Sequence, residues 1–268
     1  MDKIIGFIGS GNMGGAIIGG ITKAGLVSPE KVIAADMSSS ALENLSNRFH
    51  ICTTTNNLEV AEKADILFLA VKPGIYPIVI EQIKSSVKKD VIIIVIAAGM
   101  KIQIIEEQFG RDIKVVRTMP NTPALVGEGM SAICPNKMVS EVEMEEVKSI
   151  FNSFGESEIV GEYLMDVVTG VSGSAPAYVY MFIEAMADAA VTEGMPRTQA
   201  YRFAAQAVMG SAKMVLETGI HPGELKDNVC SPGGTTIAAV CELENKGMRT
   251  AVISAVKTAT AKSKEMSK

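Results

Sequence analysis

Residues 3–16 read KIIGFIGSGNMGGA, and this stretch decides the fold because it joins a short apolar run to three spaced glycines. Residues 4–8 have the length and the branched side chains of a buried parallel strand. They lead into Gly9-Ser10-Gly11-Asn12-Met13-Gly14, a complete G-x-G-x-x-G, and then into an apolar stretch at 16–21 that predicts a helix. A strand, a glycine-rich turn and a helix in this order are typical of a dinucleotide-binding unit.

Each glycine of the motif has its own expected task. Gly9 permits the tight turn from strand to helix, Gly11 lets the backbone approach a pyrophosphate, and Gly14 lets the helix press against the strand. The phosphates are then expected at the helix N-terminus. Free N–H groups and the positive end of the helix dipole stabilise an anion there without any Lys or Arg.

The residues that follow strengthen this interpretation, since a glycine-rich turn alone is weak evidence and most such turns bind nothing. A second expected strand, residues 31–35, ends in Asp36, where a ribose-binding carboxylate is expected. We therefore predict a dinucleotide site rather than a purely structural turn. If the dinucleotide is a nicotinamide cofactor, we expect Asp36 to favour NADH over NADPH, because a carboxylate repels a 2′-phosphate. Against this, three serines at 38–40 could cradle a phosphate.

Composition places the chain among globular proteins that act on small molecules. Its 268 residues, 47% of them hydrophobic, are enough for about two domains with separate cores. A net charge of −5 and a pI near 5.3 leave no basic footprint for nucleic acid or for a membrane surface. The four cysteines form no C-x-x-C pair and there are only two histidines, so we expect reduced structural thiols and no metal site.

The N-terminus runs directly into the first strand, without a basic region, an apolar core and a cleavage site. We therefore expect no signal peptide and a cytoplasmic protein. The longest apolar stretches either have the length of a strand or carry charges such as Glu184 and Asp188, which argues against a membrane-spanning helix.

Strand and helix patterns alternate through the first half of the chain. A polar segment is expected at 53–63, strands are expected at 65–71, 90–97 and 113–118, and helices are expected at 38–48, 75–87 and 102–109, the last closed by Gly110. This alternation predicts an α/β fold with a Rossmann-type, doubly wound and mostly parallel sheet. Its ligand is expected at the carboxyl ends of the strands.

Three expected loops lie at those carboxyl ends: Ala70-Val71-Lys72-Pro73, Ala97-Ala98-Gly99 and Met119-Pro120-Asn121-Thr122-Pro123. We expect all three to contact the cofactor. Two prolines stiffen the last loop, so that the Asn121 amide and the Thr122 hydroxyl could be presented to a nicotinamide ring. The alternatives are a turn without a ligand and, for Lys72, an ordinary solvated lysine.

The pattern changes after residue 129. Residues 130–134 and 158–160 resemble short edge strands, separated by a helix at 140–154 that opens with a Ser140–Glu143 capping box and ends at Gly155. Helices dominate past residue 162, at 164–171, 175–193, 198–217, 235–246 and 249–264. We thus predict a Rossmann domain at 1–161 and an all-helical domain at 162–268.

The helix expected at 175–193 is apolar around most of its circumference, which is typical of a helix buried on all sides. A domain of about a hundred residues can hardly cover such a helix alone. We therefore predict a homodimer whose helical domains pack together. The alternative is an ordinary monomer core.

Two segments of the helical domain stand out as loops, at 170–177 and at 227–236. The second contains Ser231-Pro232-Gly233-Gly234-Thr235-Thr236 at the mouth of a helix, which is the layout of a site for a small carboxylate or phosphate. A flexible loop with a threonine helix cap is the alternative.

The absence of His and Lys from part of the helical domain limits the kinds of reduction that the protein could catalyse. Reduction of a ketone needs a proton donor beside the oxygen, commonly His or Lys, and residues 149–212 contain neither. His50 and His221 are expected to be surface residues. A cyclic iminium asks less of a protein, because its nitrogen already carries the charge that a hydride quenches, so positioning and electrostatics can suffice.

With these residues in place, the chain resembles the pyrroline-5-carboxylate reductase family, which catalyses the last step of proline biosynthesis. The resemblance spans nearly the whole chain through FIGSGNMGGA (7–16), LAVKP (69–73), MPNTP (119–123), TGVSGSAPAY (169–178) and HPGELKDNVCSPGGTTIAA (221–239). It implies an NAD(P)H-dependent reductase of pyrroline-5-carboxylate with a Rossmann domain and a helical dimerisation domain. It also implies an assembly that is often a ring of dimers, such as a decamer.

The resemblance assigns roles by position. Ser231, Gly233, Gly234 and Thr235 would hold the substrate carboxylate, Thr236 would face the ring nitrogen as the catalytic residue, and Ser174 would also bind substrate. The implied cofactor-binding residues are Gly9, Ser10, Gly11, Asn12, Met13, Gly14, Asp36, Ala70, Val71, Lys72, Pro73, Ala97, Ala98, Gly99, Asn121, Thr122 and Pro123. Asp36 departs from family members that carry Arg or a Ser-rich pocket there, so the usual NADPH preference does not transfer to this chain by resemblance.

Two other classes compete with this interpretation. A hydroxyacid dehydrogenase of the same two-domain plan would need a lysine on the helix after Gly173, and the residues around Tyr178 supply none. A nucleotide sensor without chemistry would keep the glycine-rich loop, but it would have no obvious use for a second anion site.

Overall fold

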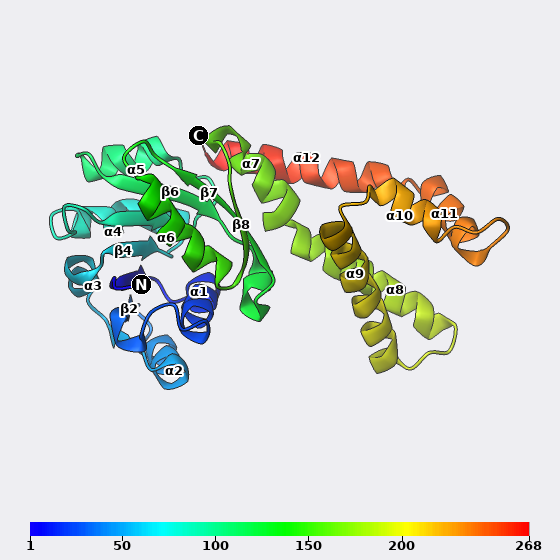
Figure 1. Cartoon of the computed structure of the whole chain (residues 1–268), viewed down its shortest axis with the longest axis horizontal. Coiled ribbons are helices and arrows are strands. Elements are labelled where there is room, and N and C mark those ends of the chain that lie inside the picture. The colour runs from blue at the N-terminus through cyan, green and yellow to red at the C-terminus, as the bar shows by residue number, and fades with distance from the viewer. Residues whose placement is uncertain (268) are drawn as a thin grey trace. The chain divides into compact units, whose positions relative to one another are not determined.

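The computed structural model describes residues 1–267 and divides them into two compact units (Figure 1). The first unit contains residues 1–174 together with 258–267, and the second contains residues 175–257. These limits differ from the expected boundary after residue 161, because residues 162–174 and the end of the last helix pack with the sheet unit.

One eight-stranded sheet forms the centre of the first unit. Its strands are β1 Ile5–Ile8, β2 Val32–Ala35, β3 Cys52–Thr54, β4 Ile66–Leu69, β5 Ile92–Val95, β6 Lys114–Met119, β7 Gly129–Pro135 and β8 Gly155–Ile159. Their order is β3-β2-β1-β4-β5-β6-β7-β8, with β1 to β6 parallel and β7 antiparallel to β6. The order reverses between β1 and β4, which is where an open α/β sheet binds its ligand. The predicted Rossmann-type fold is confirmed.

Helices cover both faces of this sheet (Figure 1). They are α1 Asn12–Lys23, α2 Ser39–Phe49, α3 Asn57–Lys63, α4 Tyr76–Ile83, α5 Ile102–Phe109, α6 Glu141–Asn152 and α7 Met165–Val168. Short turns occur at η1 Pro29–Lys31, η2 Pro73–Ile75, η3 Thr122–Val126, η4 Glu162–Leu164 and the π-helical η5 Thr169–Gly173. Helices α3, α4 and α5 share a core with one face, and α1, α2 and α6 share a core with the other.

The strands read as continuous apolar runs because both faces are covered. Every residue of β1, β2, β4 and β5 is buried. The Phe7 ring stacks on Phe68 with centroids 4.7 Å apart, and Phe151 from α6 lies 6.1 Å from Phe68. Aromatic packing thus joins β1, β4 and α6 into one core.

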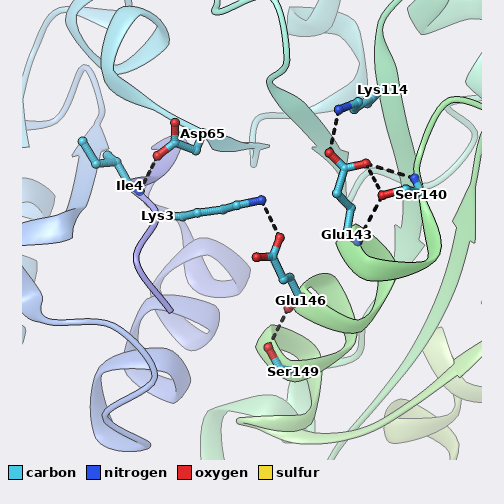
Figure 2. Close-up of polar contacts among 8 residues, drawn as sticks. All are labelled: Lys3, Ile4, Asp65, Lys114, Ser140, Glu143, Glu146 and Ser149. Carbon is cyan, nitrogen blue, oxygen red and sulfur yellow. Dashed lines mark hydrogen bonds and ion pairs between the residues drawn. The ribbon is translucent and has the colours of Figure 1, made fainter.

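Charged side chains gather where the strands begin, at the edge of the sheet opposite their carboxyl ends (Figure 2). Asp65 accepts a hydrogen bond of 2.8 Å from the Ile4 amide, Lys114 pairs with Glu143 at 2.6 Å, and Lys3 pairs with Glu146. Ser140 and Glu143 form the predicted capping box at the start of α6. These charge pairs therefore lie at the edge of the sheet where the strands begin.

Several local predictions were wrong. The segment at 53–63, expected to be polar connection, holds β3 and helix α3, whose first turn is capped by the Asn56 side chain. Strand β7 lies between β6 and β8 instead of at an edge. Gly155 begins β8 instead of ending α6. Its φ is +152°, and a Cβ there would lie 1.9 Å from the Gly129 carbonyl oxygen, so only glycine fits this position.

The segment at 170–177, expected to be a loop, is helical. Helix α7 continues through the π-helical turn η5, and α8 begins directly afterwards at Ala175. Periodicity at 3.6 residues does not reveal a π-helical turn, and such turns often mark functional sites. Helix α4 is also shorter than expected and ends at Ile83.

The second unit is all helical, as predicted. It contains α8 Ala175–Thr192, α9 Arg197–Thr218, the unpredicted α10 Pro222–Asn228, α11 Thr235–Asn245 and the first part of α12 Met248–Met266. Its large apolar side chains are widely exposed, including Tyr180 (60%), Met181 (69%) and Phe203 (67%). Helix α8 is therefore not covered within one chain. Among residues 1–267, no helix combines the length and the apolar character needed to cross a membrane.

Candidate active site

The glycine-rich turn lies between β1 and α1, at the point where the strand order reverses. Gly9 has a φ of +100°, and a Cβ there would lie 2.5 Å from the carbonyl oxygen of Ala70. A Cβ on Gly14 would lie 2.8 Å from the carbonyl oxygen of Gly9. Both positions therefore require glycine, one for the turn and the other for the close approach of helix and strand.

The N-terminus of α1 faces open space. Gly11 is its N-cap and supplies no side-chain hydrogen bond, and the first turn contains no acidic residue. No atom lies within 4 Å of a Cβ built on Gly11, and Gly11 and Asn12 are exposed. The free N–H groups of this helix end thus fit an anion of the size of a phosphate.

Asp36 is held next to this turn by the backbone. Its Oδ2 accepts hydrogen bonds from the amide and the hydroxyl of Ser10, both at 2.7 Å, and its Oδ1 accepts one from the Ser38 amide at 2.9 Å. Partial burial acts to raise the pKa of Asp36, but the hydrogen bonds from Ser38 and Ser10 outweigh it and hold that pKa below its usual range. A fixed negative charge therefore stands at the end of β2, where a ribose is expected.

The three predicted loops come together at the carboxyl ends of β4, β5 and β6, which are neighbours in the sheet. Ala70, Val71 and Pro73 are half-buried, and Lys72 is exposed. Ala97 and Ala98 are half-buried, while Gly99 is buried with a φ of +80°. These loops share one sheet edge with the glycine-rich turn, because the carboxyl ends of parallel strands lie at the same edge.

Asn121 has a structural task that the sequence did not indicate. Its side-chain nitrogen donates to the Ser172 carbonyl at 3.1 Å, and its side-chain oxygen accepts from the Met130 amide at 2.9 Å. The residue is 9% exposed, so its amide ties the proline-flanked loop to β7 and to η5. Thr122 is exposed at the start of η3. The expected contacts of both residues with a cofactor stay predictions.

Tyr76 was missed by sequence reasoning. Its buried hydroxyl donates to the Leu69 carbonyl at 2.5 Å, at the last residue of β4. Burial raises the pKa of Tyr76, and the backbone amides of Ile96 and Ala97 partly oppose that rise. The phenol therefore stays protonated and joins the ends of β4 and β5. Its position on the apolar stripe of α4 made it indistinguishable from an ordinary core residue.

In the second unit, Ser231, Pro232 and Gly233 form a turn before α11. The Gly234 amide donates to the Ser231 carbonyl at 3.0 Å, and Gly233 has a φ of +69°. Gly234 is the N-cap of α11 and supplies no side-chain hydrogen bond, so the alternative of a threonine cap is not adopted. Within the described residues, the Thr235 and Thr236 hydroxyls have no hydrogen-bond partner. The uncapped amides and hydroxyls fit a small anion.

Ser174 belongs to the first unit, where its amide donates to the Thr169 carbonyl at 2.8 Å at the end of η5. Residues 231–236 belong to the second unit. All four cysteines are free thiols. No cluster of three or more potential metal ligands occurs among residues 1–267.

The glycine-rich turn at the reversal of strand order, the uncapped start of α1 and the carboxylate at the end of β2 define a dinucleotide-binding protein of the Rossmann class. Sequence comparison agrees. A family model described as "NADP oxidoreductase coenzyme F420-dependent" matches residues 4–99.

The rest of the chain identifies the family within this class. A model described as "Pyrroline-5-carboxylate reductase dimerisation" matches residues 162–266. The pyrroline-5-carboxylate reductase of Escherichia coli (strain K12) is 54% identical over 268 residues, which is 100% of both chains. The chain belongs to the pyrroline-5-carboxylate reductase family, which confirms the resemblance seen in its motifs.

Solved structures support this assignment over the full length. A Plasmodium falciparum pyrroline carboxylate reductase with NADP bound is 36% identical and superposes with a TM-score of 0.90, covering 100% of this chain and 99% of that one. A pyrroline-5-carboxylate reductase from Coxiella burnetii is 32% identical, with a TM-score of 0.93 and full coverage of both chains. Both parts of the fold are therefore family features.

Proposed function

We propose that this protein reduces 1-pyrroline-5-carboxylate to L-proline with NAD(P)H, as the last step of proline biosynthesis. The observation that carries the proposal is the full-length match at 54% identity to a reductase of that name. NADP in the Plasmodium falciparum relative supports a nicotinamide cofactor. The cytoplasmic location expected from the sequence belongs to the same proposal.

The first unit supplies the residues for the cofactor. The N–H groups at the start of α1 would hold the pyrophosphate, Asp36 would accept hydrogen bonds from the ribose, and the loops at 70–73, 97–99 and 121–123 would line the remainder. NAD(P)H supplies a hydride to the imine carbon when it is bound.

The second unit supplies residues for the substrate. The uncapped N-terminus of α11 with Ser231, Gly233, Gly234 and Thr235 would bind the carboxylate. Ser174, which belongs to the first unit, stays a predicted substrate contact. The Thr236 hydroxyl would orient the ring nitrogen. Since the protonated imine already carries the charge that the hydride cancels, these residues act through positioning and electrostatics without a lysine or histidine acid.

Oxidation of NADH and NADPH with pyrroline-5-carboxylate, compared with a panel of 2-oxoacids, tests the reaction. We expect turnover with the cyclic imine and none with the oxoacids, and L-proline as the product by chromatography. A folded protein that binds the cofactor but does not turn over the imine would contradict the proposal. Turnover of an oxoacid instead would favour a hydroxyacid dehydrogenase.

We also propose that the helical units of two chains pack together, in a dimer or a ring of dimers. The exposed apolar side chains of α8 and the match to a dimerisation model support this. Light scattering at micromolar concentration should give at least twice the chain mass of 28.4 kDa. Met181→Glu on α8 should lower that mass, whereas Val142→Glu on α6, at a similarly exposed position, should leave it unchanged. An active wild-type monomer would refute the proposal.

Asp36 is predicted to favour NADH over NADPH. Replacing it by Ser removes the negative charge that opposes a 2′-phosphate, so the ratio of kcat/KM for NADPH to that for NADH should rise about tenfold or more. Asp36→Asn separates the charge from the hydrogen bond, because it removes the charge but keeps an oxygen that can accept from Ser10. If the charge decides the preference, this variant should raise the ratio as well. If neither variant changes the ratio, the carboxylate does not set cofactor choice.

Thr236 is predicted to act on the reaction itself. Because Gly234 already occupies the N-cap, Thr236→Val removes no helix cap and should melt near the wild-type temperature. Single-turnover hydride transfer should slow by about tenfold to a hundredfold, with cofactor affinity unchanged. A variant that melts early but transfers hydride at the normal rate would leave Thr236 a purely structural residue.

Ser231→Ala and Thr235→Val serve as the comparison for Thr236. Each removes one hydroxyl from the proposed carboxylate site, so each should raise the substrate Kd by about tenfold or more while hydride transfer at saturation changes little. Equal effects of all three variants on rate and binding would show that the roles are not separated as proposed.

A further inference from the structure

Arg117 is a buried cation in the middle of a strand that also carries Lys114 at its start and the buried Thr118. It lies on β6, is 4% exposed and is paired in register with Val95, the last residue of β5. Its Nη1 lies 3.1 Å from a carboxylate oxygen of Glu162, and its Nη2 lies 3.8 Å from one of Asp166. Burying a guanidinium without partners is energetically costly, so Arg117 needs both carboxylates. In return, its charge holds Glu162 and Asp166 in place.

Glu162 passes this constraint to the start of α5. The oxygen that faces Arg117 also accepts a hydrogen bond of 2.8 Å from the Ile102 amide, the first residue of α5. The N-cap residue Lys101 supplies no side-chain hydrogen bond, so Glu162 caps this helix from 60 positions away in the chain. Only Met100 and Lys101 separate Ile102 from the loop Ala97-Ala98-Gly99.

Asp166 connects Arg117 to the end of α12 through hydrogen bonds. Its Oδ1 accepts from the Ser263 hydroxyl at 2.7 Å and from the Ser267 hydroxyl at 3.2 Å, and both serines are 3% exposed. Figure 1 shows the C-terminal end of the chain beside α7, which carries Asp166. These contacts fix the last turn of α12 within the first unit.

The last turn of α12 forms the back of the loop at 97–99. A Cβ on Gly99 would lie 3.0 Å from the Met266 carbonyl oxygen, so the two backbones are already in close contact. Gly99 is buried, with a φ of +80°. The loop is thus anchored on one side through Ile102 and supported from behind by Met266.

We propose that Arg117 is a positioning residue for the cofactor loop Ala97-Ala98-Gly99, acting through Glu162 and through the contacts of Asp166 with Ser263 and Ser267. The five side chains of this Arg117 cluster hold the loop through two contacts, the Ile102 amide with Glu162 and the backbone of Gly99 with Met266. None of the five needs to touch the cofactor. The inference rests on the proposed function, in which this loop lines the nicotinamide-binding edge.

Two variants test it on the full-length protein. Arg117→Lys keeps the charge but loses the planar fork that reaches two carboxylates, and Ser263→Ala removes one hydroxyl from the cluster. In fluorescence titrations without substrate, Arg117→Lys should raise the Kd of the preferred NADH or NADPH about tenfold and Ser263→Ala about threefold. Amide hydrogen exchange should become faster at residues 96–102 in both.

Lys114→Met is the matched control. Lys114 begins β6, the strand that also carries Arg117, and it lies where the strands of the sheet begin. The substitution breaks its 2.6 Å pair with Glu143 of α6 (Figure 2). We expect it to change neither the cofactor Kd nor the exchange at 96–102, whatever it does to the melting temperature. Ser263→Ala keeps the test decisive if Arg117→Lys does not fold.

Two outcomes are kept apart by this design. If the wild type binds NAD(P)H and Ser263→Ala and any folded Arg117→Lys bind it equally well, the positioning role is wrong, even where the melting temperature falls. If the wild type binds no nicotinamide nucleotide, the proposed function fails, and unchanged exchange at 96–102 in the variants would then overturn the positioning role separately.

Discussion

The close contact between the backbones of Gly9 and Ala70 is the constraint on which the dinucleotide edge depends. It brings the end of β1 within reach of the loop after β4, at the one place where the strand order reverses. Any side chain at Gly9 would separate these strand ends, and one at Gly14 would push α1 away from the turn. The free amides of α1 can face an anion only because this contact holds the helix end in place.

The same edge is reinforced by polar groups that point inward. Tyr76 joins the ends of β4 and β5, Asn121 ties the loop after β6 to β7 and η5, and the Arg117 cluster anchors the loop after β5. The Tyr76, Asn121 and Arg117 side chains are buried and hydrogen-bonded, which makes their geometry specific, since a lost partner would leave an unsatisfied group in the core. These hydrogen bonds make the loops at the carboxyl ends of the strands as rigid as the sheet itself.

In the second unit, burial and side-chain size are related differently from the first. Its small residues Ala187, Ala200 and Ala204 are buried, whereas large apolar side chains such as Met181 and Phe203 stay exposed. Burial of such surface is the main favourable term in folding and association, so the proposed contact between two copies would stabilise this unit. Membership in a family with a named dimerisation region accords with that physical expectation.

The sequence by itself determined the Rossmann class, the helical second half and the glycine-rich turn, because apolar periodicity and glycine spacing are local signals. It did not reveal α3, the π-helical turn η5 or the interior place of β7, where local propensity is weak and tertiary packing decides. Only the tertiary structure brought Arg117, Glu162, Asp166 and Ser263 together, since they are up to 146 positions apart in the chain. Hydrogen bonds across such separations leave no periodic pattern, so the way the loops are held could not be predicted from the residues that form them.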